Sequence, residues 1–113
     1  MSRLIPGNII SCDLGSADRK AEERGRHYAV VISTELHNTV NRTVIVVPLT
    51  HNTKHAEWHE HFKFDIDGTE LVAMCQHIRE LDKSFINGDV VGQMGTADYE
   101  QMMKTLMVNT LQF

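Results

Sequence analysis

The stretch from residue 43 to residue 50 reads TVIVVPLT, and an earlier stretch from residue 28 to residue 32 reads YAVVI. Both runs are apolar without alternation and are rich in β-branched side chains. Such runs are typical of central strands in a sheet that is covered on both faces. Pro48 cannot donate to a strand ladder, so it marks a strand end or a bulge. The two runs predict the centre of a β-sheet, joined by an eight-residue polar connection over residues 35–42.

A first strand is expected before these runs. Residues 8–14 read NIISCDL and follow the breaker pair Pro6-Gly7, which favours a strand that begins there. Residues 16–25 read SADRKAEERG and predict a polar loop. Residues 19–26 carry four basic and two acidic side chains, which makes them the most basic short segment of the chain.

The segment after the central runs predicts a hairpin. Residues 59–66 alternate strictly between two faces. Asp67-Gly68 then gives a tight-turn signal into residues 70–78, so the two segments are expected to pair. Residues 89–92 predict one more short strand. One face of the first segment carries Glu60, Phe62, Phe64 and Ile66, and the other carries His59, His61, Lys63 and Asp65.

The C-terminal segment predicts the one clear helix of the chain. Thr96 is a good N-cap, and Asp98 and Glu100 complement the positive end of the helix dipole. Core-facing positions then recur at helical spacing, although this methionine-rich stripe could also be read as a groove for a partner. The fold class that follows is mainly β: a small, mostly antiparallel β protein with a C-terminal helix. The stripe consists of Tyr99, Met102, Met103, Leu106 and Thr110.

Length and composition restrict the classes of protein. A chain of 113 residues supports one core, so residues 1–113 are expected to form a single domain. A net charge of −4 argues against a generic polyanion binder and still allows a local basic groove. The longest apolar runs have about five residues, against roughly 20 for a membrane span, and the N-terminus predicts no secretory signal. Cys12 and Cys75 make no disulfide framework, so a reduced, cytoplasmic protein is expected.

Pairing of the two central runs brings polar residues to one end of the sheet. In an antiparallel hairpin through residues 35–42, the numbers of opposite residues sum to about 77. Arg26 then lies opposite His51, one position from Thr50, and His27 lies beside it. A guanidinium, imidazoles and a hydroxyl together suit an anionic phosphate, because arginine offers a bidentate fork and threonine a further donor. The alternative is that these side chains are simply solvated strand ends.

A histidine-rich segment suggests a metal site at first. Its four imidazoles fall within eleven residues. A structural zinc site, however, usually has four ligands, often including cysteine, and neither cysteine lies near this segment. A solvated strand and loop is therefore the preferred interpretation, and no metal or cofactor is expected. The four residues are His51, His55, His59 and His61.

Two more residues have both a structural and a functional interpretation. Cys75 and His77 could form a nucleophilic pair, but a buried structural cysteine is favoured because no activating context surrounds Cys75. Trp58 could stack on a nucleobase, and it could equally cap the core.

Four segments of the chain, in order, carry a family resemblance. Residues 7–15 (GNIISCDLG) are similar to the pattern Gly-Asp-(Ile/Val)-apolar-x-x-Asp-Leu. Residues 25–33 (GRHYAVVIS) are similar to Gly-x-Arg-Pro, three apolar residues, (Ile/Val) and Ser. Residues 43–50 are similar to Val, three apolar residues, Pro, (Ile/Leu) and Thr, and residues 77–84 (HIRELDKS) to Gln-Ile-Arg-Thr-(Leu/Ile)-Asp-Lys-Ser. Together with the closing helix, this order and spacing resemble the PemK/MazF family of toxin–antitoxin endoribonucleases over nearly the whole chain.

The resemblance implies a fold, an activity and partners. The fold is a compact, partly open β-barrel of the CcdB/PemK type, usually a homodimer. The activity is metal-independent cleavage of single-stranded RNA or mRNA, which leaves a 2′,3′-cyclic phosphate and a 5′-hydroxyl. The partner is a cognate antitoxin, with DNA binding by the toxin–antitoxin complex. The family's active-site arginine falls on Arg26 and its threonine on Thr50, the two residues that the hairpin geometry brings together.

Internal attack by the 2′-hydroxyl needs a base, donors to the phosphorane oxygens and an acid for the 5′-oxygen. Arg26 and Thr50 fit the role of donors to the phosphorane oxygens. Arginine is too basic to serve well as the general base. Imidazoles change charge near neutrality, which makes His27, His51 and His77 the acid or base candidates. The candidate catalytic residues are Arg26, Thr50, His27 and His77, and the candidate RNA-binding residues are Arg19, Lys20, Arg24, His51, Gln76 and Arg79.

The sequence departs from the family pattern in three places. The loop motif Gly-Ser-Glu-Gln-x-Gly-x-Arg-Pro lacks its Ser-Glu-Gln part, and His27 replaces its proline. Gln76 is an amide where some members have a carboxylate, and Phe85 replaces an arginine. Three functions are therefore compatible with the sequence: an endoribonuclease toxin, a catalytically silent binding or regulatory module, and a CcdB-like inhibitor of a protein target.

Overall fold

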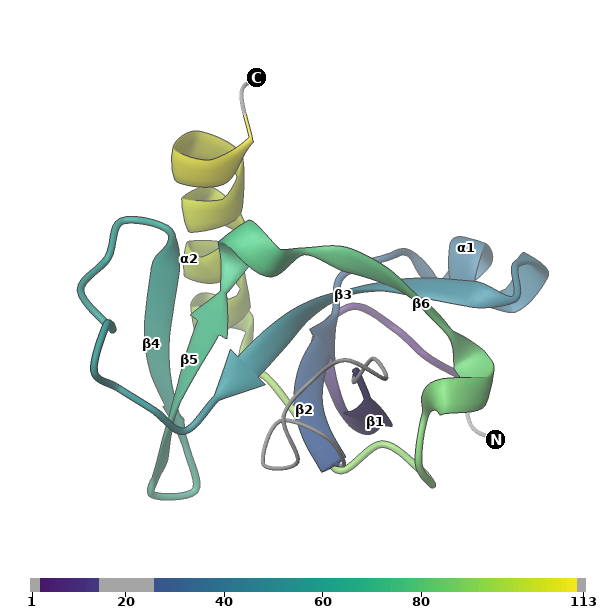
Figure 1. The fold of residues 1–113 in the computed structure, drawn as a ribbon. Coiled ribbons are helices and arrows are strands. Elements are labelled where there is room, and N and C mark those ends of the chain that lie inside the picture. The colour runs from purple at the N-terminus through teal and green to yellow at the C-terminus, as the bar shows by residue number, and fades with distance from the viewer. Residues whose placement is uncertain (1–2, 15–25, 112–113) are drawn as a thin grey trace.

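The computed structural model describes residues 3–14 and 26–111. Within these ranges seven strands form one curled antiparallel sheet in the order β4-β5-β3-β2-β1-β7, and β6 pairs with β3 off this path (Figure 1). A C-terminal helix, α2, stands beside β4 and β5 (Figure 1). The predicted class, mainly β with a C-terminal helix, is confirmed. The strands are β1 (Asn8–Asp13), β2 (Arg26–Val31), β3 (Thr43–Thr50), β4 (His61–Ile66), β5 (Thr69–Met74), β6 (Arg79–Asp82) and β7 (Gly92–Gln93). The helices are α1 (Glu35–Val40) and α2 (Thr96–Thr105), and helical turns cover Cys75–His77, Lys83–Phe85 and Leu106–Thr110.

The two central runs pair in the predicted register. The pairs run from Tyr28–Leu49 to Val31–Val46, and each pair of numbers sums to 77. Pro48 lies opposite Ala29 inside β3, neither at a strand end nor at a bulge. On its other edge β3 pairs with β6 through residues 43–46 and with β5 through residues 49–50. Pro48 therefore lies where β3 changes neighbours, and its missing N–H removes no bond from either ladder.

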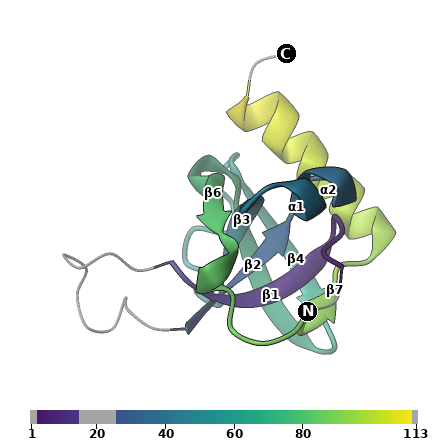
Figure 2. The same cartoon turned by 90° about the vertical axis from the view of Figure 1, so that its right-hand side faces the viewer.

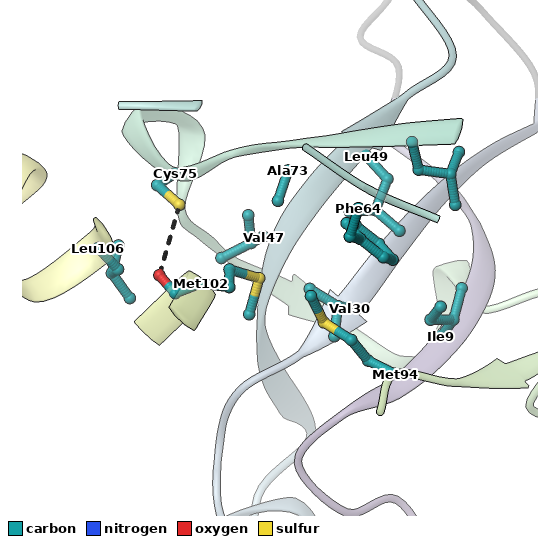
Figure 3. Close-up of a cluster of buried hydrophobic side chains, with 11 residues drawn as sticks. Ile9, Val30, Val47, Leu49, Phe64, Ala73, Cys75, Met94, Met102 and Leu106 are labelled. Carbon is teal, nitrogen blue, oxygen red and sulfur yellow. Dashed lines mark hydrogen bonds between the residues drawn. The ribbon is translucent and has the colours of Figure 1, made fainter. Parts of the chain in front are cut away.

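Two hydrophobic clusters cover the two faces of this sheet, as the unalternating runs predict. Successive residues of β3 point to opposite faces, so Val47 belongs to one cluster and Val46 to the other. Met102 and Leu106 reach the first cluster from α2 and the turn after it (Figure 3). The first cluster contains Ile9, Val30, Val47, Leu49, Phe64, Leu71, Ala73, Cys75, Met94, Met102 and Leu106. The second contains Leu4, Ile10, Cys12, Leu14, Ala29, Val31, Val44, Val46, Leu81 and Ile86.

The connection over residues 35–42 contains a short helix that the sequence analysis did not predict. The Thr34 hydroxyl caps α1 by accepting from the His37 N–H at 3.2 Å. Asn38 is buried, and its amide donates to the Leu4 carbonyl at 2.8 Å and to the Ser33 carbonyl at 3.1 Å. The segment looked like a loop because its buried contact is a hydrogen-bonded amide rather than an apolar side chain.

The predicted hairpin is confirmed for β4 and β5, but it is shorter than expected. Asp67 and Gly68 both have positive φ, 51° and 84°, as a tight two-residue turn requires. The prediction that the second strand continues to residue 78 is wrong, because Cys75–His77 form a tight helical turn. This turn takes the chain from β5 to β6, past the point where β3 changes neighbours.

Three smaller predictions meet different outcomes. The core-facing stripe of α2 is confirmed: Met102 and Leu106 are buried and Tyr99 packs against the same cluster. The N-cap is Gly95 rather than Thr96, which begins the helix. The last short strand is β7, displaced from the expected residues 89–92, and it pairs with β1 (Figure 2). In the part of the chain that the structure describes, no helix is long and apolar enough to span a membrane.

Candidate functional site

A cavity of about 600 Å³ opens at the gap between β5 and β6. Pro48 and Leu49 of β3 form one side, and the Cys75–His77 turn and the start of β6 form the other. The cavity exists because the turn lifts the chain away from β3 at the point where Pro48 has no strand partner on that edge. It is lined by Leu14, His27, Pro48, Leu49, Met74, Gln76, His77, Ile78, Arg79 and Glu80.

Four of the predicted site residues line this cavity. His27 comes from β2 and is half-buried, and its backbone pairs with Cys12 of β1. Gln76 is half-buried and His77 exposed on the helical turn. The exposed Arg79 begins β6, and its guanidinium donates to the Leu14 carbonyl at 3.3 Å. Two imidazoles, one guanidinium and one amide thus converge on one cavity from three separate elements.

Thr50 and Arg26 lie at strand ends near the same part of the sheet. Thr50 ends β3, is half-buried and shares a face with Pro48, which lines the cavity. Its hydroxyl oxygen accepts from the Asn52 N–H at 3.1 Å. Arg26 begins β2, where its backbone pairs with Asp13 of β1. The ladder between β2 and β3 ends at Tyr28–Leu49, two residues after Arg26.

Other predicted residues lie elsewhere. His51 is exposed, and its ring meets the Tyr28 ring edge-on with centroids 6.1 Å apart. It lines a second cavity of about 300 Å³ with Tyr28 and Asp67, so the structure does not bring it to the cavity of His27. Arg19, Lys20 and Arg24, the predicted basic loop, lie outside the described residues.

The Gln76 amide is oriented by a histidine that the sequence analysis did not select. The Nδ1 atom of His61 lies 2.8 Å from the His55 carbonyl oxygen, which can only accept, so Nδ1 carries the proton. In the neutral ring Nε2 is then an acceptor, and it receives a hydrogen bond from Gln76 Nε2 at 2.8 Å. The Gln76 Oε1 atom is buried without a hydrogen-bond partner. His61 therefore fixes which end of the amide faces it.

The histidine-rich segment has a structure of its own. Trp58 is 53% exposed, with the His55 ring stacked on it at 4.1 Å and 20°. The His61 ring lies 5.3 Å from Trp58 on a tilted plane. Trp58 thus does not cap the core. Within the described ranges, no group of three or more His, Cys, Asp or Glu side chains is arranged to hold a metal ion.

Both cysteines are buried free thiols on opposite faces of the sheet. Burial raises the pKa of Cys12 to about 11 and the pKa of Cys75 to about 11. Cys75 lies on the helical turn rather than on a strand with His77, and its thiol points toward the Met102 carbonyl at 4.0 Å (Figure 3). A raised pKa and complete burial oppose thiolate formation, which supports the structural interpretation of Cys75.

Two residues at the cavity escaped the sequence analysis. Glu80 lines it and supplies a carboxylate, whose Oε2 accepts from the Thr43 hydroxyl at 2.8 Å. His61 does not line the cavity, but its ring contacts Gln76, which does. The sequence predicted a continuous strand through residue 78, and a continuous strand would not bring these side chains together. The helical turn at residues 75–77 does so. The alternating pattern did indicate that His61 leaves the core side of β4.

Comparison of the sequence with known proteins identifies a family and a relative. The family model of PemK-like, MazF-like toxins of type II toxin–antitoxin systems matches residues 5–109. A curated Mycobacterium tuberculosis protein described as a candidate toxin, Rv3098A, is 32% identical over 101 residues. This match covers 89% of this chain and 89% of the relative.

Solved structures share the fold. MazF of Deinococcus radiodurans is similar with a TM-score of 0.77 and 18% identity, covering 94% of both chains. MazF in a MazE–MazF complex from the same organism has a TM-score of 0.78 at 18% identity, with 94% of each chain covered. An endoribonuclease from a mycobacterial species, solved with its cognate antitoxin, has a TM-score of 0.69 at 22% identity and covers 94% of this chain and 91% of that one. The predicted barrel of the PemK type is therefore confirmed.

Proposed function

The chain belongs to the PemK/MazF family of toxins of type II toxin–antitoxin systems, and from that premise we propose that it is an endoribonuclease that cleaves single-stranded RNA without a metal. The observation that carries the proposal is the cavity at the gap between β5 and β6. It combines acid–base groups, His27 and His77, with a cationic donor, Arg79. These are the group types that phosphodiester cleavage by internal attack requires.

In the proposed reaction the ribose 2′-oxygen forms a bond to phosphorus and the bond from phosphorus to the 5′-oxygen breaks. A base takes the 2′-hydroxyl proton, and an acid gives a proton to the departing 5′-oxygen, so the products are a 2′,3′-cyclic phosphate and a 5′-hydroxyl. His27 and His77 are our candidates for these two roles, and Glu80 offers a carboxylate in the same cavity. Arg26, Thr50 and Arg79 are the proposed donors to the phosphorane oxygens.

We also propose the partners of a family member. An acidic, hydrophobic tail of a cognate antitoxin would bind across residues 16–26 and the dimer groove, and it would compete with RNA for the basic segment at residues 19–26. Proteins of similar fold that were solved with an antitoxin support an antitoxin as the partner. A homodimer in the cytoplasm, and DNA binding by the complex with antitoxin, complete the proposal.

The test is incubation of the purified chain with a long single-stranded RNA in excess EDTA, followed by chemical mapping of the new ends. We expect cleavage at a limited set of sequences, with cyclic phosphate on one side and 5′-hydroxyl on the other. Arg26→Ala and Thr50→Ala should each lower the rate at least about a hundredfold, the scale for the loss of one transition-state donor.

Arg42→Ala is the matched control, because Arg42 is an exposed arginine at the opposite end of β3 that pairs with Asp82 at 3.3 Å. Its rate should equal that of the unmodified chain. RNA binding without cleavage would instead indicate a silent binding module. Activity that disappears in EDTA and returns with zinc or manganese would refute the metal-independent mechanism.

A further inference from the structure

The exposed ring of Trp58 lies on the segment between β3 and β4. About half of the side chain, 53%, is open to solvent. The His55 ring lies nearly parallel to it, at 20° and 4.1 Å between centroids. Together the two rings form an exposed stack, which we call the Trp58–His55 platform. A ligand that covers this aromatic surface would remove it from water, which favours binding there.

Hydrogen bonds hold this platform in place although it lies in a connection between strands. The Trp58 N–H donates to the His55 carbonyl at 3.1 Å, and the His61 N–H donates to the Trp58 carbonyl at 2.9 Å. The same His55 carbonyl lies 2.8 Å from the His61 ring. The Asn109 amide, from the turn after α2, donates to the His59 carbonyl at 2.8 Å. A flat ligand would therefore meet a preorganised surface and would pay little to order it.

The platform also connects directly to the cavity. The His61 ring lies 5.3 Å from Trp58 and accepts a hydrogen bond from Gln76 at 2.8 Å. Gln76 lines the cavity together with His27, His77 and Arg79. His61 thus contacts both Trp58 of the platform and Gln76 of the cavity wall. A chain-like ligand that occupies the cavity can place its next unit on Trp58.

The shape of the platform selects the ligand. Two parallel rings present a flat surface rather than a concave apolar groove, and Trp58 is absent from the lining of the cavities described above. A flat surface suits a nucleobase, which stacks on an aromatic ring whatever its identity. The neighbouring charges, Lys54, Glu57 and Glu60, do not form a cationic patch, so the contact would be with a base and not with a phosphate.

We infer that the Trp58–His55 platform is a nucleobase-stacking site for single-stranded RNA, next to the cavity where the backbone is cleaved. This inference rests on the proposed function. It assigns the contact to the base alone, so removal of the ring should weaken binding of RNA with bases and leave binding of the bare backbone unchanged. Stacking of one base on an aromatic ring is worth roughly 1–3 kcal/mol by alanine substitution, which corresponds to about a fivefold to hundredfold change in affinity.

The chain has a single tryptophan, so its intrinsic fluorescence reports on Trp58 alone. The probe is a single-stranded oligonucleotide of about ten units in which every sugar is 2′-O-methylated, a length within the usual range of such sites. Methylation removes the internal nucleophile, so binding is measured without cleavage. The matched probe has the same backbone with abasic sites. We expect the first probe to quench Trp58 fluorescence and the abasic probe to leave it unchanged.

Affinity is then measured by anisotropy of the labelled probes with variants of the full chain. Trp58→Ala should bind the base-containing probe about fivefold to hundredfold more weakly and the abasic probe equally well, while Trp58→Phe should recover part of the loss. Leu36→Ala is the control, since Leu36 is 72% exposed on α1, outside the family motifs, and the affinity of this variant should not change.

Each outcome decides the inference. Equal affinity of Trp58→Ala and the unmodified chain for the base-containing probe, or no binding of that probe at all, would overturn it. Quenching by the antitoxin but not by the probe would also overturn it, because the platform would then serve a protein. If the probe leaves Trp58 fluorescence unchanged but the chain cleaves RNA, the stacking inference is wrong and the proposed function is unaffected. Quenching without any RNA cleavage would support the platform and refute the nuclease.

Discussion

Replacement of His61 by phenylalanine tests the hydrogen-bonded link between the cavity and the platform. Phenylalanine keeps a ring beside Trp58 but can neither donate to the His55 carbonyl nor accept from Gln76. The exposed His55 carbonyl can accept a hydrogen bond from water instead, so its loss of the imidazole lowers the free energy of unfolding by about 0.5–1 kcal/mol. The Gln76 amide loses its one hydrogen bond while its oxygen is already buried without a partner, which adds about 1–2 kcal/mol. The sum is about 2 kcal/mol.

This loss should lower Tm by roughly 8 °C, at about 4 °C per kcal/mol for a chain of this size. Thermal and urea unfolding followed by circular dichroism measure it, with His59→Phe, an exposed imidazole on the same segment, as the control. Gln76→Leu removes the buried unpaired oxygen together with the donor and should cost less. The double variant should be more stable than the sum of the single changes by about 1 kcal/mol, since the two groups contact each other. Strict additivity of the two changes would refute the assigned bond.

Three more predictions concern the thiols, the basic segment and the histidines. Burial raises the pKa of Cys12 and of Cys75 from 9.0 to about 11, so the unfolded chain releases these protons at lower pH than the folded chain, and stability should fall between about pH 9 and 11. Both thiols should also resist alkylation at pH 8 until the chain unfolds. Loss of stability that begins well below pH 8 would point to other groups. Charge reversal of Arg19, Lys20 and Arg24 should weaken binding of RNA and antitoxin and flatten the salt dependence of RNA affinity, and an unchanged slope would exclude this segment from the interface. The unmodified chain and the His59→Ala variant should cleave RNA at the same rate in excess chelator. If cleavage requires added zinc, the histidine-rich segment would again be a candidate metal site.

The sequence determined the centre of the sheet because its signal there is local and strong. The runs at residues 28–32 and 43–50 are apolar on both faces, and this property alone predicts burial from two sides. Their connection is short, so the register followed from counting, and the pairs from Tyr28–Leu49 to Val31–Val46 confirm it. The turn at Asp67-Gly68 was equally local, because only a few residue types accept positive φ at both positions.

The sequence did not predict the features that depend on long-range contacts. The helical turn at Cys75–His77 breaks a strand pattern for a reason that lies on β3, where the ladder passes from β5 to β6 around Pro48. That turn brings Gln76, His77 and Arg79 to one cavity. Helix α1 depends on the buried Asn38 amide and its bond to Leu4, a residue far away in the sequence. Polar burial of this kind has no periodic signal.

The candidate site was predictable in part. Two residues of the family motifs, His77 and Arg79, share a cavity with His27, which came from the hairpin geometry, whereas Thr50 is not among the residues that line it. His51 was expected there from residue numbers alone, yet it packs on Tyr28 beside another cavity. His51 lies one residue beyond the end of β3, where the register of the ladder no longer sets the direction of a side chain.

The most direct test of the proposed chemistry is cleavage of two RNAs that differ by one oxygen atom. Once the cleaved position is mapped, a second RNA is made with a single 2′-deoxy sugar on the 5′ side of that bond, and both are incubated with the chain in excess EDTA. Internal attack predicts that the unmodified RNA is cut to a 2′,3′-cyclic phosphate and that the deoxy RNA is not cut at that bond, although both bind with similar affinity. Cleavage of the deoxy RNA at the normal rate would contradict the account, because the nucleophile would then be water or a side chain.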